Sequence, residues 1–230
     1  MRILFSILIA SIAVFNVQAQ DVILDVETAV DTIEPKKGPN YKRYAHLFMG
    51  FGVNAQLGEK GGLITPGLDQ FQLGTRYKYK FNETFSAGWE WAYASSSFNM
   101  KQTSSKFTPD TFLHDRQRLI FYNLRLGAYL RINFGRRGNT LGKYLDLAGY
   151  GDYVFAHTLF TKITLADESV LRIRRSQLDY FQRINYGVEA RIGVGKIIVF
   201  GNYRLSNLFY KPYGFVELPR LNAGIQFVLR

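Results

Sequence analysis

The segment Gln70-Phe71-Gln72-Leu73-Gly74-Thr75-Arg76-Tyr77-Lys78-Tyr79-Lys80-Phe81 decides the fold, because apolar and polar residues alternate along it almost without a break. Successive side chains of a β-strand point to opposite faces of the sheet. One face of this strand is therefore mostly aromatic or aliphatic, and the other carries Arg76, Lys78 and Lys80. A soluble sandwich also alternates, with its apolar face turned inward, whereas a small outer-membrane barrel turns that face to lipid.

Seven more segments alternate in the same way, which makes eight strands in all. They cover residues 46–56, 70–81, 85–94, 120–134, 145–155, 179–192, 197–206 and 221–229. The segment 145–155 has the weakest pattern, because Gly149 and Gly151 interrupt its apolar face. An even strand count is typical of single-chain bacterial barrels. We therefore predict an all-β fold, an eight-stranded antiparallel up-and-down transmembrane β-barrel.

The connectors between these segments alternate between short and long. Residues 82–83, 135–143 and 195–196 form the shorter ones, and residues 58–68, 99–115, 158–176 and 207–219 form the longer ones. Short turns of outer-membrane barrels lie in the periplasm and long loops lie outside the cell. The pattern predicts a protein of the bacterial outer membrane with both termini in the periplasm, and a soluble sandwich has no reason to follow it.

The N-terminus reads as a secretory signal peptide, residues 1–19, with a charged start, an apolar run at 3–15 and a small-residue site at 17–19. A membrane anchor is the alternative, but the apolar run is shorter than the roughly 20 residues that a spanning helix needs. Residues 20–40 then form a periplasmic lead-in, and 41–230 form the barrel. The chain contains no cysteine, which excludes disulfides and thiolate chemistry.

Charged residues on the inward face predict a filled interior. An eight-stranded barrel is just wide enough for side chains to fill it. The predicted network of charges in the lumen consists of Arg76, Glu90, Arg125, Asp152, Glu189 and Arg191. Unpaired, such buried charges would cost several kcal/mol each, so we expect them to pair and to plug the lumen. An ion or proton path is the alternative use.

The histidines His46, His114 and His157 fall on a first strand, a loop and a strand end. A metal site or catalytic base would need them to converge with carboxylates. We predict no catalytic residue, no metal site, no cofactor and no enzymatic activity.

The formal net charge of +11 suggests anionic partners. In this setting the basic excess suits lipid head groups better than nucleic acid. Arg172, Arg174 and Arg175 lie in the third long connector and are candidates for contacts with lipopolysaccharide phosphates, because guanidinium groups pair well with phosphate. The alternative is an extended hairpin wall with solvated arginines.

Two of the long connectors are more aromatic than solvated loops need to be. Exposed apolar clusters often mark an interface, and packing of the loops over the barrel mouth is the alternative. The candidate partner surface consists of Phe107, Phe112, Phe209, Tyr210 and Tyr213.

The hairpin with Asn185-Tyr186-Gly187-Val188-Glu189-Ala190-Arg191-Ile192-Gly193, then Gly195, then Val199-Phe200-Gly201-Asn202-Tyr203-Arg204-Leu205-Ser206-Asn207-Leu208-Phe209, resembles the PorT-like outer-membrane β-barrel family. The resemblance covers about 41–230. It implies a small outer-membrane barrel with a cleaved signal, and some members serve as accessory components of secretion or envelope machines. It implies no shared catalytic residues.

Three functions remain open from the sequence. The first is a non-enzymatic structural or accessory subunit of a larger outer-membrane complex, with other outer-membrane proteins and membrane lipid as partners. The second is a surface binding module for lipopolysaccharide or an extracellular ligand. The third is a narrow channel.

Overall fold

The computed structural model describes residues 38–55, 64–65, 67–103, 112–135, 138–165, 167–176 and 178–229. The predicted signal peptide, most of the predicted lead-in, and Phe107 lie outside the described residues. No helix in the described part of the chain is long and apolar enough to cross a membrane.

Ten strands and one short 3-10 helix make up the regular structure of the described residues. They are β1 (Arg43–Ala55), β2 (Ile64–Thr65), β3 (Gln70–Lys80), β4 (Phe85–Met100), β5 (Arg116–Phe134), β6 (Lys143–Thr164), β7 (Val170–Ser176), β8 (Ile184–Val194), β9 (Ile197–Arg204), η2 (Lys211–Tyr213) and β10 (Leu221–Leu229).

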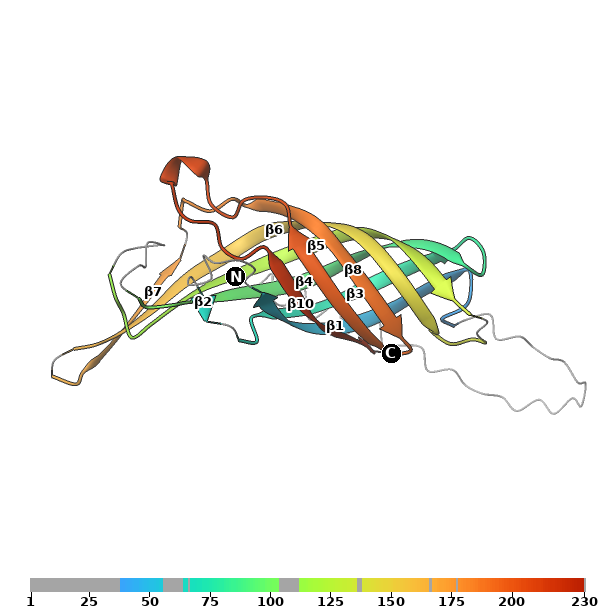
Figure 1. Ribbon diagram of the computed structural model, residues 1–230, viewed down its shortest axis with the longest axis horizontal. Coiled ribbons are helices and arrows are strands. Elements are labelled where there is room, and N and C mark those ends of the chain that lie inside the picture. Colours follow the sequence, from blue (N-terminus) through green and yellow to red (C-terminus); the bar gives the residue numbers. More distant parts are fainter. Residues whose placement is uncertain are drawn as a thin grey trace, which may run out of the picture. The chain divides into compact units, whose positions relative to one another are not determined.

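Eight of these strands form a closed antiparallel ring. Apart from β2 and β7, each strand pairs with the strands before and after it in the chain, and β10 returns to pair with β1. The ring closes through the register from Leu47 opposite Leu229 to Ala55 opposite Leu221. β2 adds to the end of β4, and β7 adds to the end of β6 (Figure 1). The structure is thus an all-β antiparallel sheet with a ring of eight strands.

At one end of the ring, backbone conformation and side-chain hydrogen bonds within the turns keep them short. Val194 pairs with Ile197, and Gly195 between them has a φ of +60°, a conformation that a two-residue hairpin demands and that glycine adopts without strain. Between β3 and β4, the side-chain oxygen of Asn82 accepts hydrogen bonds from the N–H groups of Thr84 at 2.9 Å and Phe85 at 2.7 Å. These turns tie strands tightly and leave little chain for a loop.

The other end of the ring differs from the prediction, most of all in the segment 158–176. The predicted loop 158–176 is mostly an extension of the sheet, because β6 continues to Thr164 and returns as β7. This hairpin and the start of β5 project beyond the other strands (Figure 1). β8 starts at Ile184, later than predicted, since Phe181 just before it bridges to Phe209.

Side chains fill the ring in layers. At the short-turn end lies a small apolar cluster of Leu141, Tyr144, Ile198 and Val228, with Tyr44 packed against it. The middle is polar and charged. At the opposite end lies a larger apolar cluster with Phe98, Phe121 and Phe209 among its members. Inward glycines make room for rings, as where Gly193 lies against the Tyr144 ring.

Candidate functional site

The six charges predicted for the lumen meet inside the ring. Arg76 Nε donates to Glu90 Oε2 at 2.7 Å, and Arg191 Nη1 donates to the same oxygen at 2.5 Å. Arg191 Nη1 also donates to Glu189 Oε1 at 3.2 Å. The carboxylate of Glu189 accepts in turn from Arg125 Nη1 at 3.2 Å. The six groups therefore form one continuous chain of ion pairs across the interior.

The chain ends at Asp152, which Arg125 holds in a two-point contact. Arg125 Nε and Nη2 donate to the two oxygens of Asp152 at 2.7 and 2.8 Å. The fork of a guanidinium matches a carboxylate in this arrangement. The Arg125 guanidinium also lies 3.9 Å from the centre of the Tyr150 ring. This residue is thus held on several sides.

Sequence reasoning missed a second two-point pair, Arg131 with Asp146. Arg131 Nε and Nη2 donate to Asp146 at 2.6 and 2.8 Å, and both side chains are fully buried. Arg191 Nε lies 3.4 Å from Asp146, which joins this pair to the chain. The signal was present, because both residues lie on inward faces, but their partnership depends on the β5–β6 register.

The middle of the interior therefore holds paired charges. Every member of the network is at most 7% exposed, and aromatic rings lie over the guanidinium groups of Arg76, Arg125, Arg131 and Arg191. Buried charges need such partners to offset their lost hydration. No group of three His, Asp or Glu residues within the described part of the chain is placed to hold a metal ion.

The aromatic loops pack over the ring end that carries β7. Phe209 is 3% exposed, and its ring contacts those of Phe181 at 5.1 Å and Phe215 at 5.3 Å. Tyr210 and Tyr213 remain exposed, at 42% and 51%. Phe112 is also exposed. The structure thus buries Phe209 in a packed lid and leaves Tyr210, Tyr213 and Phe112 exposed, although the Tyr213 ring stacks on Phe215 with centres 6.0 Å apart.

The three arginines predicted to contact lipopolysaccharide separate onto two faces. Arg172 pairs with Lys162 and Arg174 pairs with Phe160, so these arginines share one face of the hairpin. Arg175 is opposite Leu159 and lies on the other face. The structure brings together the first two and parts them from the third.

Arg172 and Arg174 lie in a larger basic cluster that sequence reasoning did not assemble. Arg116 on β5 pairs with Lys162, which in turn pairs with Arg172. Arg118 pairs with Phe160, which pairs with Arg174. We call the outward side chains of Arg116, Arg118, Lys162, Arg172 and Arg174 the basic face. Adjacent strands lie about 5 Å apart, so these cations spread over about 10 Å across three strands.

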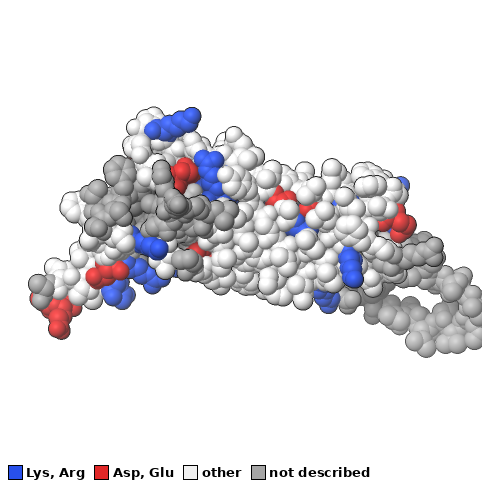
Figure 2. Space-filling model, in the orientation of Figure 1, with Lys and Arg blue, Asp and Glu red and all other residues white. Residues whose placement is uncertain are grey.

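The cations of the basic face are largely uncompensated. Within the described residues, none of the five forms an ion pair within salt-bridge distance. Arg118 Nη2 donates to Ser97 Oγ at 2.8 Å. Asp69 lies at the margin near Arg118, and burial raises the pKa of its carboxyl group. Figure 2 shows Lys and Arg side chains on the end of the molecule that carries β7, with Asp and Glu side chains at its tip.

A hollow of about 460 Å³ opens between these cations. Four arginines line it, Arg116, Arg118, Arg172 and Arg174, together with Thr158 and the apolar side chains of Ile120, Tyr122 and Phe160. The hollow therefore combines guanidinium groups with apolar surface. It can take a ligand that is anionic at one end and apolar at the other.

A row of outward aromatic rings begins directly beside the hollow. Tyr122 lies 6.5 Å from Phe155 and 6.5 Å from Tyr93, measured between ring centres. The row continues from Tyr93 to Phe71 at 6.5 Å and from Phe71 to Phe51 at 5.5 Å. These rings come from five neighbouring strands. The basic face thus adjoins an aromatic row that crosses more than half of the ring.

Comparisons with known proteins give no family. No family model matches the chain, and no curated protein matches it. Its PorT-like resemblance therefore stays a prediction from the sequence. A search of solved structures returns the crystal structure of Ail, the attachment invasion locus protein of Yersinia pestis, in complex with the heparin analogue sucrose octasulfate. The two share 11% identity with a TM-score of 0.30, over 84% of this chain and 95% of that one.

Proposed function

We propose that this chain is a non-enzymatic outer-membrane protein whose basic face binds the phosphate groups of lipopolysaccharide. In this proposal the ring is an eight-stranded up-and-down barrel that spans the membrane. Both termini lie in the periplasm, and the end that carries β7 lies outside the cell. The interior is a structural plug, so the function resides on the outer wall.

The outward surface of the ring supports membrane insertion. Its outward side chains carry no charge over residues 45–55, 71–79, 85–95, 120–134, 145–155, 184–194, 197–203 and 221–229. Many are large and exposed, such as Leu126 at 59%, Leu130 at 65% and Ile184 at 68%. Water would penalise so large a contiguous apolar surface, and lipid does not.

The dimensions of this surface fit a bilayer. On β5 the outward residues from Tyr122 to Phe134 are all apolar or aromatic. At ~3.3 Å per residue this stretch is about 40 Å long. A strand tilt of ~40° reduces it to about 30 Å along the barrel axis, against a band of ~25 Å in known barrels.

Aromatic rings at the two borders of the surface also fit a bilayer. The row from Phe51 to Phe155 lies towards the β7 end. Towards the short turns, Tyr77 lies 5.9 Å from Trp89. Tyrosine and tryptophan favour the interfaces of membranes, where one part of the ring is apolar and the other wet.

The observation that carries the function is the position of the basic face directly above this apolar wall. The hollow joins four arginines to Ile120, Tyr122 and Phe160. A phosphorylated lipid could place its phosphates among the arginines while its acyl chains follow the wall. Arginine binds phosphate in two-point contacts, and several arginines across three strands suit a head group with more than one phosphate.

Orientation favours lipopolysaccharide over other anionic lipids. The longer connectors and the projecting hairpin share the end that carries the basic face. In outer-membrane barrels that end faces the outside, where the outer leaflet consists of lipopolysaccharide. The basic face then lies at the height of the lipid phosphates.

An accessory role in a larger complex receives less support from the described loops. The partner surface predicted from aromatic loop residues included Phe209, but this residue is buried in the lid. A narrow channel is opposed by the continuous ion-pair chain from Arg76 to Asp152. Binding at the basic face requires neither a partner protein nor an open lumen.

The test compares charge reversal on the basic face with charge reversal on the other face of the same hairpin. The protein is reconstituted in phosphatidylcholine nanodiscs, and its affinity for lipid A is measured by microscale thermophoresis. Arg172→Glu with Arg174→Glu should weaken binding at least tenfold. Arg172→Glu alone and Arg175→Glu form the matched pair, with one reversal on each face: the first should weaken binding several-fold, and the second should leave the affinity within twofold.

The ligand is varied in the same assay. Lipid A without phosphates should bind at least tenfold more weakly to the unaltered protein. Equal binding of both lipid forms, or equal losses in Arg172→Glu and Arg175→Glu, would remove the proposal. Retarded gel mobility before boiling confirms that each variant retains its folded ring.

A further inference from the structure

A second hollow lies at the opposite end of the ring, among the short turns. It measures about 730 Å³ and is formed by the start of β1, the turns before β6 and β9, and the end of β10. Volumes of this size suit small-molecule ligands. This hollow and the basic face lie at opposite ends of the strands, and the proposed function makes no use of the hollow.

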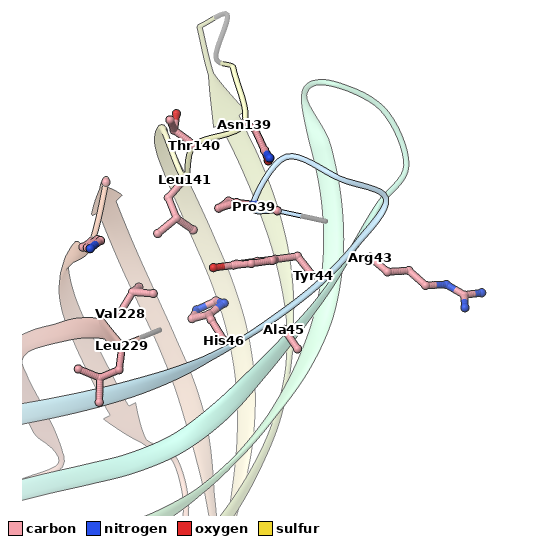
Figure 3. A pocket seen from close by; sticks show the side chains of 13 residues that line it. Pro39, Arg43, Tyr44, Ala45, His46, Asn139, Thr140, Leu141, Val228 and Leu229 are labelled. Carbon is pink, nitrogen blue, oxygen red and sulfur yellow. The ribbon is translucent and has the colours of Figure 1, made fainter. Parts of the chain in front are cut away.

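His46 lies in this hollow without a hydrogen-bond partner. Its side chain is 5% exposed, and neither Nδ1 nor Nε2 has a partner in the described part of the chain. Figure 3 shows the imidazole beside the Tyr44 ring, with Leu141 and Val228 facing the same space. The two rings stack with centres 5.3 Å apart. Buried polar groups are nearly always satisfied, so the two nitrogens of this ring are candidate contacts for a bound molecule.

The charges around His46 select the kind of ligand. Arg76 lies opposite His46 in the register of β1 and β3, and Lys78 Nζ lies 5.8 Å from the centre of the Tyr44 ring beside it. A neutral imidazole offers one N–H donor and one lone pair. A further cation, Lys196, lies on the rim. An anionic oxygen is therefore the favoured acceptor for the His46 N–H.

The walls of the hollow add an apolar requirement. Leu141 and Val228 belong to the buried apolar cluster at this end, and Tyr44 packs against that cluster. A fully hydrated inorganic anion would leave this surface unused. A molecule with an oxyanion at one end and a short apolar body uses both parts.

The backbone at the mouth is held in place. Lys78 Nζ donates to the carbonyl oxygen of Pro39, and Tyr41 N–H donates to Gly38 at 3.1 Å. Asn139 Oδ1 accepts from Asn40 N–H at 3.3 Å, which joins this segment to the turn before β6. One lip of the hollow is thus preformed, which lowers the entropic cost of binding.

We propose that this hollow binds small amphipathic oxyanions, carboxylates or phosphate monoesters, through a hydrogen bond from His46 and an ion pair with Lys196. The apolar body of the ligand packs against Leu141, Val228 and Tyr44. This site is separate from the basic face, and each stands or falls by its own experiment.

The experiment records imidazole NMR signals of protein labelled at histidine and folded in uncharged maltoside micelles. Hexanoate and hexyl phosphate are titrated separately, and hexanol serves as the neutral analogue. The His46 signals, assigned with His46→Phe, should shift in a saturable way with at least one anion, with an affinity at least tenfold above that for hexanol. The stronger anion identifies the class of head group.

Variants and reference signals complete the design. Lys196→Glu should weaken anion binding at least threefold without moving the signals of His157. His114→Asn lies just before β5, at the end of the ring opposite the hollow, and should leave the titration unchanged. His46 signals that do not respond to either anion at 20-fold molar excess and above, or that respond equally to hexanol, would overturn the proposal. The anion and hexanol titrations themselves use the unaltered protein, so the comparison between them does not depend on the folding of Lys196→Glu or His114→Asn.

Discussion

The Arg131–Asp146 pair allows a quantitative test of the plugged interior. Both side chains are fully buried, and Arg131 makes its ion pair with Asp146 alone among the described residues. Asp146→Leu therefore strands a guanidinium beside the ring of Tyr144, whose centre lies 3.6 Å away. Removing one partner of a buried pair costs about 3–5 kcal/mol. With a urea dependence of about 2 kcal/mol per M, the unfolding midpoint should fall by about 2 M.

Replacing both partners should restore most of this loss. Arg131→Met combined with Asp146→Leu removes the stranded charge and fills the space with apolar atoms, which is often neutral. We expect the double variant to unfold within about 1 M urea of the unaltered protein. Its remaining deficit comes from the lost contact of Asp146 with Arg191 at 3.4 Å and from the lost stacking on Tyr144.

The assay is equilibrium unfolding in lipid vesicles, followed by tryptophan fluorescence. The two tryptophans of the chain, Trp89 and Trp91, both lie on the outward apolar wall and report its transfer from lipid to water. Asp179→Leu, at an exposed position just before β8, is the control and should change stability by less than about 0.5 kcal/mol. A double variant no more stable than Asp146→Leu alone would refute the account of the interior as mutually dependent ion pairs.

Four further outcomes follow from the same structure. Leu130→Arg, in the middle of the outward wall, should lower the unfolding free energy in vesicles by about 2–4 kcal/mol, whereas an equally stable variant would argue against lipid contact there. Lipid A affinity should fall as NaCl rises from about 0.05 to about 0.5 M, with a flatter dependence when Arg172 and Arg174 are reversed; parallel dependences would assign the salt effect elsewhere. The same affinity should rise between about pH 5 and pH 7.5, because a phosphate monoester loses its second proton near pH 6 while arginine stays charged, and a flat profile would mean that the monoanion suffices. Planar-bilayer recordings should stay silent, and a steady ohmic current would contradict the sealed interior.

Much of the ring follows from the sequence because its physical cause is local. Alternation of apolar and polar residues is a property of neighbours in the chain, and it locates the strands to within a few residues, as at the starts of β3, β4, β9 and β10. The same alternation assigns inward and outward faces. The inward charges of the network could therefore be named before their partners were known.

Partners across strands could not be predicted in the same way, because they depend on register. Arg131 and Asp146 are opposite each other only through the β5–β6 pairing, and Arg191 reaches Glu90 across the interior. The segment 158–176 was predicted to be a loop because its many polar and charged side chains resemble those of a solvated loop. Pairing with β5 and between its own two arms makes it a sheet.

One residue decides which arginines form the basic face. Tyr122 pairs with Ala156 and Asn123 pairs with Val154, so Phe155 is an extra residue in β6, a β-bulge. Before the bulge in the chain, the odd-numbered residues of β6 point outward; after the bulge, the even-numbered residues point outward.

Without that extra residue, the odd-numbered residues of β6 would continue to point outward as far as Leu159. Its partner Arg175 would then point outward, and Arg172 and Arg174 would turn to the opposite face. The sequence grouped the three arginines because the segment 158–176 was predicted to be a loop, and a loop does not assign side chains to faces. The composition of the basic face is thus set by the geometry of the wall beneath it, at the aromatic row where Phe155 itself contacts Tyr122.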